Sequence, residues 1–474
     1  MKALMIQGTA SGVGKSVLVA GLCRLLARNG IKVAPFKPQN MSNNAAVTID
    51  GGEIGRAQAL QAMACGIKPT VDMNPVLIKP EADHKAQLIV RGKATGRLQA
   101  KRFRQDRIIL LDTVLESFEL LKNEYDVVMV EGAGSPAEPN LREGDIANMG
   151  FAEAADVPVW LVGDINRGGV FASLKGSLDI LSRSERARVQ ALLINGFRGS
   201  KELLDDALVW LENETHKPLA GVIPWLPLEL PEEDSPFRHA NNAVDNSKFN
   251  IAVIAYPRMS NHDDIDPLAA EETVDVHFAR SPQEVQPADL IVLPGSKHVS
   301  SDLLWLKAQG FEQALKKHLR YGGRILGICG GLQMLGNAID DDGVEGCSIR
   351  GLGLLDISTT MGKEKVLRQV DEQAMFPKKT RVTGYEIHHG ISDINEDLFP
   401  FAKCSADQQV WGTYIHGLFE QGEFRSAWLS SLGIASDSIT QSERTMASLD
   451  ALADALETEL APELLAPLLQ GKVG

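Results

Sequence analysis

Short runs of β-branched and apolar residues alternate with helical patterns along this chain, in two separate blocks. In the first block the runs that read as buried strands are 3–6, 33–36, 127–130, 159–162 and 191–194. In the second block they are 251–255, 290–293, 324–328 and 410–415. Buried strands that alternate with helices form parallel sheets covered by helices. The sequence therefore predicts an α/β protein with two parallel sheets.

A proline-rich and then polar stretch, from Pro224 to Asn246, separates the two blocks. This composition is typical of a linker. We expect a first domain over residues 1–230, a linker over 231–249 and a second domain over 250–474. The last part of the chain has leucines at helical spacing, at Leu449, Leu452, Leu456 and Leu460. We expect this tail to form a helix packed on the second domain.

Composition and charge exclude several classes of protein. The 474 residues are 44% hydrophobic and 23% charged, as in ordinary globular proteins. Acidic residues outnumber basic ones by 62 to 48, and the net charge of −14 disfavours binding to nucleic-acid phosphates. No apolar run approaches the roughly 18 residues that span a bilayer, and the N-terminus lacks a signal-peptide pattern. We expect a cytoplasmic protein without nucleic-acid or membrane partners, and its 5 scattered cysteines indicate neither disulfides nor zinc.

A glycine-rich turn, GTASGVGKS from Gly8 to Ser16, lies between the first predicted strand and a helix. Glycines allow backbone N–H groups to converge on phosphate oxygens, and the helix N-terminus adds its dipole. The residues expected to bind a nucleotide are Gly12, Val13, Gly14, Lys15 and Ser16, with the Ser16 hydroxyl on Mg²⁺. Thr9 occupies the place of the first glycine in the standard P-loop, so the alternative is a glycine-rich turn without a ligand.

Three further side chains are candidates for the nucleotide site. The strand 127–130 runs into Glu131, an acid suited to Mg²⁺, although Glu131 could instead cap the next helix. The strand 191–194 ends in Asn195, whose amide is suited to reading the edge of a base, although asparagine is also common in turns. Asp50, just before two glycines, is a further candidate for the metal.

The sharpest signal in the sequence is Cys329, which lies between the strand 324–328 and a helix that starts with glycines. Small neighbours permit the strained turn that exposes a nucleophile, and the helix N-terminus lowers the pKa of the thiol. The N–H of Gly330 and a second donor from the turn at Gly295 would form an oxyanion hole. The alternative is a buried structural cysteine.

A thiolate nucleophile needs a base, and His416 ends the late strand at 410–415. The alternative for His416 is a core histidine with no catalytic role. His388 and His389 are rival candidates for the base, or they line the substrate pocket.

Taken together, these motifs resemble the cobyric acid synthase family of glutamine-dependent amidotransferases, over nearly the whole chain. Three stretches are similar to segments particular to that family: 37–44, 163–171 and 231–235. The resemblance implies an N-terminal P-loop NTPase domain of the dethiobiotin-synthetase type. It also implies a C-terminal class I glutaminase domain, which is a flavodoxin-like α/β fold.

The resemblance implies a reaction in cobalamin biosynthesis that uses ATP, Mg²⁺ and glutamine. Carboxylates b, d, e and g of adenosylcobyrinic acid a,c-diamide would be amidated to give adenosylcobyric acid. Each carboxylate would be activated by phosphorylation, and ammonia would come from glutamine through a thioester on Cys329 with His416 as the base. The residues expected to contact the acceptor are Lys37, Asn40, Asp164 and Arg167.

The sequence departs from ordinary class I glutaminases at Leu418, where they carry a glutamate two residues after the histidine. The imidazole of His416 would then be oriented by Glu386 or Glu420, or the site is a cysteine–histidine dyad. Two other functions stay open: the related cobyrinic acid a,c-diamide synthase, and an ATP-driven switch protein with a degenerate second domain. An intact thiol site argues against the switch, because a switch needs no nucleophile.

Overall fold

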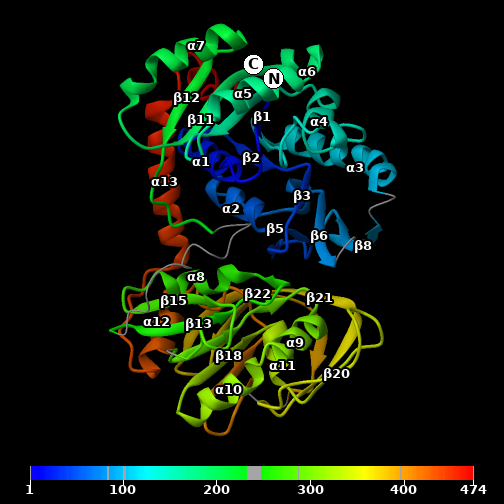
Figure 1. The fold of residues 1–474 in the computed structure, drawn as a ribbon, viewed down its shortest axis with the longest axis vertical. Helices are drawn as coiled ribbons and strands as arrows, with labels where there is room; N and C mark the ends of the chain where they lie inside the picture. Colours follow the sequence, from blue (N-terminus) through cyan, green and yellow to red (C-terminus); the bar gives the residue numbers. More distant parts are fainter. Residues whose placement is uncertain are drawn as a thin grey trace. The chain divides into compact units, whose positions relative to one another are not determined.

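The computed structural model describes residues 2–82, 85–99, 103–231, 247–286, 288–394 and 398–472. The chain divides into two compact units (Figure 1). The first unit comprises Met1–Ser42, Thr48–Leu230 and Thr445–Gly474, and the second comprises Asn43–Val47 and Pro231–Arg444. Most of the predicted linker, residues 232–246, lies outside the described residues, as does most of the stretch 231–235.

The first unit is built on a parallel six-stranded sheet. In spatial order its strands are β12 (Leu219–Pro224), β11 (Val189–Phe197), β10 (Val159–Asp164), β1 (Ala3–Gly8), β9 (Val127–Glu131) and β2 (Val33–Phe36). Because β1 lies inside the sheet, the turn that follows it opens at the carboxyl edge between β10 and β9. Ligands of open α/β sheets bind at that edge.

Helices cover both faces of this sheet. Successive side chains of β1 point to opposite faces and are all buried, so each face needs a layer of helices. Ala3 and Met5 lie in the core beneath α3 (Phe103–Glu124), α4 (Met149–Ala154) and α5 (Val170–Ile180). Leu4 and Ile6 lie in the core beneath α1 (Lys15–Arg28), α13 (Gln441–Glu459) and α14 (Pro462–Leu468). The other helices of this unit are α2 (Arg56–Ala64), α6 (Arg183–Arg188) and α7 (Asp205–Thr215).

The C-terminal helix packs on the first unit, so our expectation that it packs on the second domain is wrong. Leu449, Leu452 and Leu456 of α13, together with Leu460 just after it, share a core with Leu18 and Leu22 of α1. Gly21 permits the close approach, since a Cβ there would lie 2.6 Å from Leu456 Cδ1. Helical spacing predicts an apolar face, but it does not identify the surface that the face covers. Figure 1 draws α13 in red beside the first sheet.

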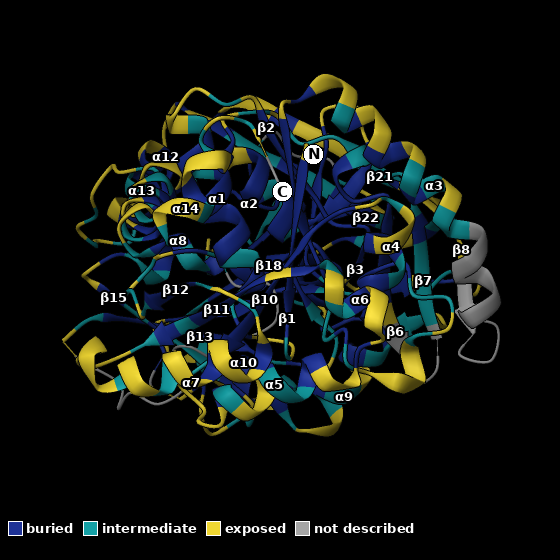
Figure 2. Cartoon of the chain, turned by 90° about the horizontal axis from the view of Figure 1, so that it is seen from above, coloured by how far each residue is buried: buried dark blue, intermediate teal, exposed yellow. Residues whose placement is uncertain are grey.

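The second unit is built on a sheet that is parallel apart from its last strand. In spatial order the strands are β15 (Val274–Ala279), β13 (Phe249–Ile254), β16 (Leu290–Leu293), β18 (Arg324–Ile328), β24 (Val410–Thr413) and β23 (Lys403–Cys404). One face packs on α9 (Val299–Ala308), α10 (Phe311–Arg320) and α11 (Gly330–Leu335). The other packs on α8 (Asp266–Ala269) and α12 (Gly422–Ser431). Figure 2 shows the strands of both sheets buried and the outer faces of helices exposed.

Smaller sheets complete the two units. In the second unit they contain β14 (Met259–Ser260), β17 (Gly295–Ser296), β19 (Ala338–Asp340), β20 (Ile349–Arg350) and the long antiparallel pair β21 (Ser358–Ala374) and β22 (Thr380–Ser392). In the first unit they contain β3 (Gln39–Met41), β6 (Val76–Ala82), β7 (Lys85–Val90) and β8 (Lys93–Gln99). Two short strands remain, β4 (Ala45–Val47) and β5 (Glu53–Gly55).

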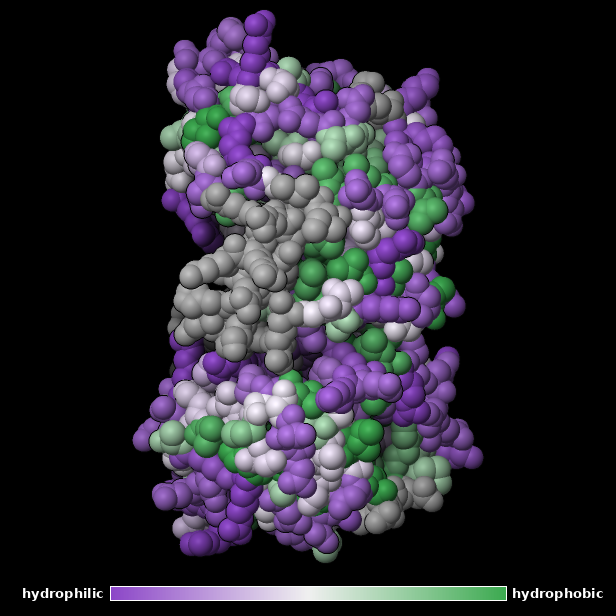
Figure 3. Space-filling model, turned by 90° about the vertical axis from the view of Figure 1, so that its right-hand side faces the viewer, coloured by the Kyte–Doolittle hydropathy of each residue, from purple (hydrophilic) through white to green (hydrophobic). Residues whose placement is uncertain are grey.

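The surface drawn in Figure 3 is mostly hydrophilic, in keeping with the acidic composition. None of the helices in the described chain is both long and apolar enough to cross a membrane.

Candidate active site

The phosphate loop has the backbone conformation that its glycines predict. Gly12 and Gly14 adopt φ values of 74° and 93°, in the left-handed region that glycine enters without steric cost. Lys15 begins α1 and curls over the loop, where its Nζ donates to the carbonyl oxygens of Ala10 and Gly134, both at 2.9 Å. The Lys15 ammonium group is thus held over the loop, where a bound phosphate would meet it.

Asn195 of β11 braces this loop from the side. Its Nδ2 donates to the carbonyl oxygen of Val13 at 2.9 Å. A Cβ at Gly14 would collide with the same amide. The side chain that we assigned to a base edge therefore contacts the phosphate loop in this structure, and base recognition by Asn195 stays a prediction.

Glu131, at the end of β9, is buried and accepts hydrogen bonds from side chains in and around the loop. Its Oε1 accepts hydrogen bonds from Ser16 Oγ and Lys37 Nζ, each at 2.7 Å, and its Oε2 accepts one from Gln61 Nε2 at 2.6 Å. Burial alone would raise the pKa of Glu131, but the Lys37 charge and these hydrogen bonds outweigh burial, so the pKa lies below its ordinary value. The carboxylate is therefore ionised, and its positively charged partner is the Lys37 ammonium group.

Ser16 and Glu131 could supply two protein ligands to a bound Mg²⁺. These two predicted ligands are hydrogen-bonded to each other. The ion pair with Lys37 shows that Glu131 Oε1 can bind a positively charged group. Among the described residues no three His, Cys, Asp or Glu side chains cluster as a metal site. A cation would therefore take its other ligands from phosphate and water, as Mg²⁺ commonly does. The third candidate, Asp50, lies in an exposed turn, where its carboxylate accepts a hydrogen bond from the Thr48 hydroxyl.

The four residues expected to contact the acceptor lie in different surroundings. Lys37 contacts Glu131, as described above. Arg167 is exposed beside the loop, since a Cβ at Gly12 would lie 3.6 Å from its Nη2. Asp164 ends β10 and accepts the N–H of Asn166 at 2.9 Å, with Arg167 Nε 3.9 Å away. Asn40 is buried, and its Nδ2 donates to Gln58 Oε1 at 3.0 Å. Of these four described side chains, Lys37 lies at the phosphate site through Glu131, and Arg167 lies beside Gly12 of the loop.

Cys329 has the geometry of a nucleophile elbow. It follows β18, precedes α11 and adopts φ 52° and ψ −107°, a strained conformation for a residue with a side chain. Glycines make the turn possible, because a Cβ at Gly331 would collide with the Leu293 carbonyl. The sulfur lies 3.6 Å from the Ile387 carbonyl oxygen, so β22 passes beside the thiol.

His416 lies next to Cys329 and is held by a carboxylate. Its Nδ1 is 2.7 Å from Asp264 Oδ2, and Asp264 Oδ1 accepts the N–H of Gly417 at 2.8 Å. Burial alone would lower the pKa of His416, but the Asp264 charge and its hydrogen bond, together with the Cys329 hydrogen bond, raise it to about 10. The imidazole is therefore protonated at neutral pH and can stabilise a thiolate on Cys329.

Asp264 is the residue that sequence reasoning missed, and our candidates Glu386 and Glu420 were wrong, as was the dyad. Glu386 instead pairs with Arg368, with Oε1 2.7 Å from Nη2. Burial would raise the pKa of Glu386, but His388 and Arg368 lower it to about 2. Glu420 folds back, with Oε1 3.4 Å from where a Cβ on Gly417 would lie. The available signal was an acidic cluster, Asp263, Asp264 and Asp266, shortly after the strand at 251–255.

The two predicted oxyanion glycines surround the same pair. Gly330 begins α11, where the first N–H groups of a helix have no partner within the helix. A Cβ at Gly330 would lie 2.9 Å from Ser296 N, and one at Gly295 would lie 3.3 Å from His416 Cε1. Both turns therefore approach the thiol site closely, while their roles as donors stay a prediction.

The rival histidines lie on β22, near the thiol. His388 stacks on Tyr414 with ring centroids 3.9 Å apart, and its Nδ1 is 2.6 Å from the Gly390 carbonyl oxygen. His389 Nδ1 is 3.2 Å from the Gly362 carbonyl oxygen, and burial together with Lys365 lowers its pKa to about 4. His388 Nε2 lies 3.8 Å from Glu386 Oε2, but it is His416 that Asp264 holds beside the thiol, so His416 is the better-placed histidine.

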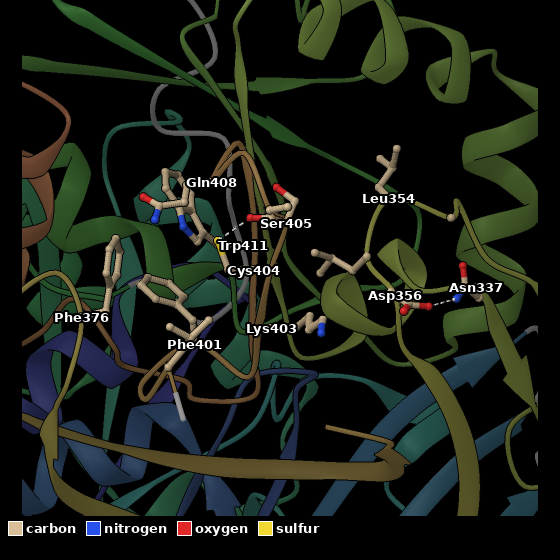
Figure 4. A pocket seen from close by; sticks show the side chains of 14 residues that line it. Asn337, Leu354, Asp356, Phe376, Phe401, Lys403, Cys404, Ser405, Gln408 and Trp411 are labelled. Atoms are coloured by element: carbon tan, nitrogen blue, oxygen red, sulfur yellow. Dashed lines mark hydrogen bonds between the residues drawn. The ribbon is translucent and has the colours of Figure 1, made fainter. Parts of the chain in front are cut away.

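A separate cavity of about 570 Å³ lies elsewhere in the second unit (Figure 4). Its walls include the aromatic rings of Phe376, Phe401 and Trp411 and the polar side chains of Asp356 and Lys403. Cys329 and His416 are not among its lining residues. The cavity is therefore distinct from the thiol site.

Two family models match the chain. Residues 4–237 match the CobQ/CobB/MinD/ParA nucleotide binding domain, and residues 250–424 match the CobB/CobQ-like glutamine amidotransferase domain. A cobyric acid synthase of Halorhodospira halophila is 58% identical over 98% of both chains. A cobyric acid synthase of Aliivibrio fischeri is 48% identical over 98% of this chain and 97% of its own. The chain belongs to the cobyric acid synthase family.

Family membership confirms the predicted resemblance, the α/β fold class and the prediction of an amidotransferase enzyme of cobalamin biosynthesis. Solved structures that align with part of the chain include MinD of Aquifex aeolicus, at 14% identity and a TM-score of 0.29, covering 48% of this chain and 84% of that one. PurLQS of Thermotoga maritima aligns at 16% identity and a TM-score of 0.28, covering 43% of this chain and 98% of that one. The sequence relatives, and not these weak structural matches, carry the assignment.

Proposed function

We propose that this enzyme converts adenosylcobyrinic acid a,c-diamide to adenosylcobyric acid by amidating carboxylates b, d, e and g with ATP and glutamine. The observation that carries the proposal is the presence of two chemically complementary sites, a Cys329–His416–Asp264 site and a P-loop with an ionised Glu131. One site releases ammonia and the other activates a carboxylate. Relatives named cobyric acid synthase over nearly the full chain support the choice of acceptor. An ATP-dependent reaction of this kind fits a cytoplasmic location.

In the thiol site, the Cys329 thiolate attacks the side-chain amide carbon of glutamine, and the C–S bond forms as negative charge moves onto the oxygen. The N–H groups of Gly330 and Gly295 would stabilise this oxyanion. His416 donates its proton to the leaving nitrogen, the C–N bond breaks and ammonia departs. His416 then takes a proton from the water that hydrolyses the thioester to glutamate. Asp264 keeps the imidazole in the required orientation and tautomer.

In the phosphate site, an oxygen of the acceptor carboxylate attacks the γ-phosphate of ATP, giving an acyl phosphate and ADP. Lys15 and the loop N–H groups stabilise the charge that develops on the phosphates. Ser16 and Glu131 would hold Mg²⁺, which supplies further positive charge there. Ammonia then attacks the acyl carbon and inorganic phosphate leaves, because phosphate is a far better leaving group than oxide. Arg167, which is exposed beside the loop, would meet an acceptor carboxylate directly, whereas Lys37 would first have to give up its contact with Glu131.

The test is mass spectrometry of the corrinoid after incubation with the enzyme, ATP, Mg²⁺ and glutamine. We expect adenosylcobyrinic acid a,c-diamide to gain four amides, with glutamate, ADP and phosphate as the other products. Conversion of cobyrinic acid to its a,c-diamide, with no further reaction, would favour the a,c-diamide synthase instead. ATP hydrolysis without any corrinoid amidation would favour the switch protein. A reaction without ATP is the matched control.

A further inference from the structure

The turn 294–297, which follows β16 and contains β17, lies against both members of the thiol site. A Cβ at Gly330 would lie 2.9 Å from Ser296 N, and one at Gly295 would lie 3.3 Å from His416 Cε1. On its other side the turn is paired with β14, because β17 and β14 form a small antiparallel sheet. The turn is therefore confined between the nucleophile elbow, the imidazole and β14. A small shift of this turn would change where its N–H groups point.

One buried carboxylate ties this turn to the segment beside it. Asp302 lies in the first turn of α9 and is completely buried. Its Oδ2 accepts a hydrogen bond from Ser296 Oγ at 2.6 Å, and its Oδ1 accepts the backbone N–H of Arg258 at 3.2 Å. Ser296 Oγ in turn accepts the N–H of His298 at 3.1 Å. Because Arg258 directly precedes β14 and Ser296 ends β17, the carboxylate joins both strands of the small sheet to α9.

The Asp302 carboxylate is ionised at neutral pH. Burial raises the pKa of Asp302 to about 6, while the Ser296 hydrogen bond and the Arg258 charge act in the opposite direction. Arg258 Nη1 lies 3.8 Å from Asp302 Oδ1 and supplies that positive charge. Hydrogen bonds to an ionised acceptor are stronger than those between neutral groups. Asp302 therefore holds the Ser296 hydroxyl and the Arg258 N–H firmly.

A second buried group holds the beginning of the turn. The Tyr256 hydroxyl donates a hydrogen bond to the Pro294 carbonyl oxygen. Burial and then the Asp302 charge raise the pKa of Tyr256 well above its ordinary value, so its hydroxyl stays a neutral donor. Pro294 is thus held by Tyr256 and Ser296 by Asp302. Gly295, which lies between them, has its position fixed from both sides.

We propose that Asp302 is a positioning residue for glutamine hydrolysis, which holds Ser296 and thereby keeps the N–H of Gly295 aimed at the oxyanion. This inference rests on the proposed function, because it assigns glutamine hydrolysis to the Cys329 site. The Asp302 carboxylate does not touch glutamine, and it acts through the Ser296 hydroxyl. Its effect is therefore confined to the steps in which charge builds up on the carbonyl oxygen. These steps are the attack of the thiolate on the amide and the attack of water on the thioester.

The test uses the whole enzyme and substitutions on either side of one hydrogen bond. Asp302→Ala removes the acceptor, Ser296→Ala removes the donor, and a double variant removes both. Asp302→Asn keeps an oxygen for the Arg258 N–H and tests rescue by a conservative change. Asp407→Ala is the matched control, because Asp407 also accepts from a serine hydroxyl and a backbone N–H. Asp407 lies in an exposed turn that precedes β24, whereas His416 follows that strand.

Two reactions of the same thiol separate the oxyanion turn from the nucleophile. Release of glutamate from glutamine passes through an oxyanion. Alkylation by iodoacetamide does not: the thiolate attacks the methylene carbon, the C–S bond forms, the C–I bond breaks and iodide leaves. Alkylation is followed by mass spectrometry on the proteolytic peptide that contains Cys329, since other free cysteines can also react.

We expect Asp302→Ala to lower kcat for glutamine about tenfold, with KM changed less than about twofold, because an oxyanion donor acts mainly in the transition state. Ser296→Ala should give a similar loss. The double variant should lose no more than the larger single loss, because both substitutions remove the same contact. Asp302→Asn should lose about threefold, and alkylation of Cys329 should stay within about twofold of the wild type throughout. Asp407→Ala should match the wild type in both reactions.

Wild-type kcat in both Asp302→Ala and Ser296→Ala would overturn the proposal. So would equal losses of glutamine hydrolysis and alkylation, because the substitutions would then act on the thiolate itself. Losses that add in the double variant would also overturn it, since the two side chains would then act separately. If Asp302→Ala lacks a cooperative thermal unfolding transition, Asp302→Asn and Ser296→Ala decide the same question. Failure of the proposed function looks different: the wild type would then amidate no corrinoid even with ammonium chloride, whatever the substitutions do to glutamate release.

Discussion

The phosphate site and the thiol site of this enzyme are assembled in contrasting ways. The phosphate site is mostly local, because Gly8 to Ser16 form one strand–turn–helix and Glu131 joins from the neighbouring strand. The thiol site is non-local, because Asp264 and His416 are 152 residues apart and meet Cys329 only through the order of the strands. A local site can be read from a motif. A non-local site needs the topology as well.

The two sites also differ in the charge that they stabilise. Around Glu131, the charge of Lys37 and the hydrogen bonds from Lys37, Ser16 and Gln61 hold a buried carboxylate in its ionised form. Around His416, a buried carboxylate raises the imidazole pKa and so keeps a positive charge beside the Cys329 sulfur. The first arrangement suits phosphate activation and the second suits nucleophilic attack.

The largest effect is expected from Lys15→Ala. Amidation should fall at least about a hundredfold with either glutamine or ammonium chloride, because removing an electrostatic donor at a developing charge has that order of cost. Glutamine hydrolysis should persist. Corrinoid amidation by mass spectrometry and glutamate release in the same sample measure both. Amidation with ammonium chloride at the wild-type rate would remove the P-loop from the reaction.

Asp264→Asn should lower glutamine hydrolysis by about two to four orders of magnitude, because an amide favours the wrong tautomer of the imidazole. Ammonia-dependent amidation should be nearly unchanged. Steady-state glutamate release, with ammonia-dependent amidation as the control, separates the two sites. A loss of only a few fold would return the site to a cysteine–histidine dyad.

The pH profile of glutamine hydrolysis gives a finer test of the same carboxylate. Since the pKa of His416 is raised to about 10, the imidazolium persists through neutral pH and is lost as pH rises through about 10. Activity should therefore decline on the alkaline side near that value, and the limb should shift to lower pH in Asp264→Asn. Rates of glutamate release in buffers of constant ionic strength measure it. An alkaline limb near the ordinary histidine pKa, about 6.5, would contradict the paired state.

The smallest effect is expected from Glu386→Gln, which removes the same charge as Asp264→Asn but from a side chain that faces Arg368. Glutamine hydrolysis should fall by less than about threefold, since an orienting role belongs to the group that contacts the imidazole. The two substitutions, assayed side by side for glutamate release, form a matched pair. A larger loss in Glu386→Gln than in Asp264→Asn would reverse our assignment of the acid.

The parallel strands were predictable because their residues are buried on both faces and form continuous apolar runs. The predicted runs at 290–293 and 324–328 coincide with β16 and β18, and 33–36 coincides with β2. The pair β21 and β22 was not predicted, because β21 has many exposed polar residues and β22 alternates buried with partly exposed ones, so neither strand forms a continuous apolar run. Thr380–Ser392 nevertheless supplies the carbonyl that faces the thiol.

The proximity of Cys329 and His416 was predictable because strand ends and glycines mark both residues, while their catalytic roles stay a prediction. Asp264 was not, because nothing in its local sequence shows that β13, β16, β18 and β24 stand side by side. For the same reason, the sequence did not predict that α13 packs on the first unit or that Asn43–Val47 belongs to the second unit. Periodicity predicts which face is apolar, whereas the surface that covers it is a tertiary property.

The central claim is that the two sites divide the labour, with ammonia made at Cys329 and used at the phosphate site. It is tested most directly by mass spectrometry of the corrinoid made by Cys329→Ser with ATP and either glutamine or ammonium chloride. We expect no amidation with glutamine and near wild-type amidation with ammonium chloride, because the thiolate has no part in activating the carboxylate. Loss of both activities in a variant that still unfolds cooperatively, or amidation with glutamine, would contradict it.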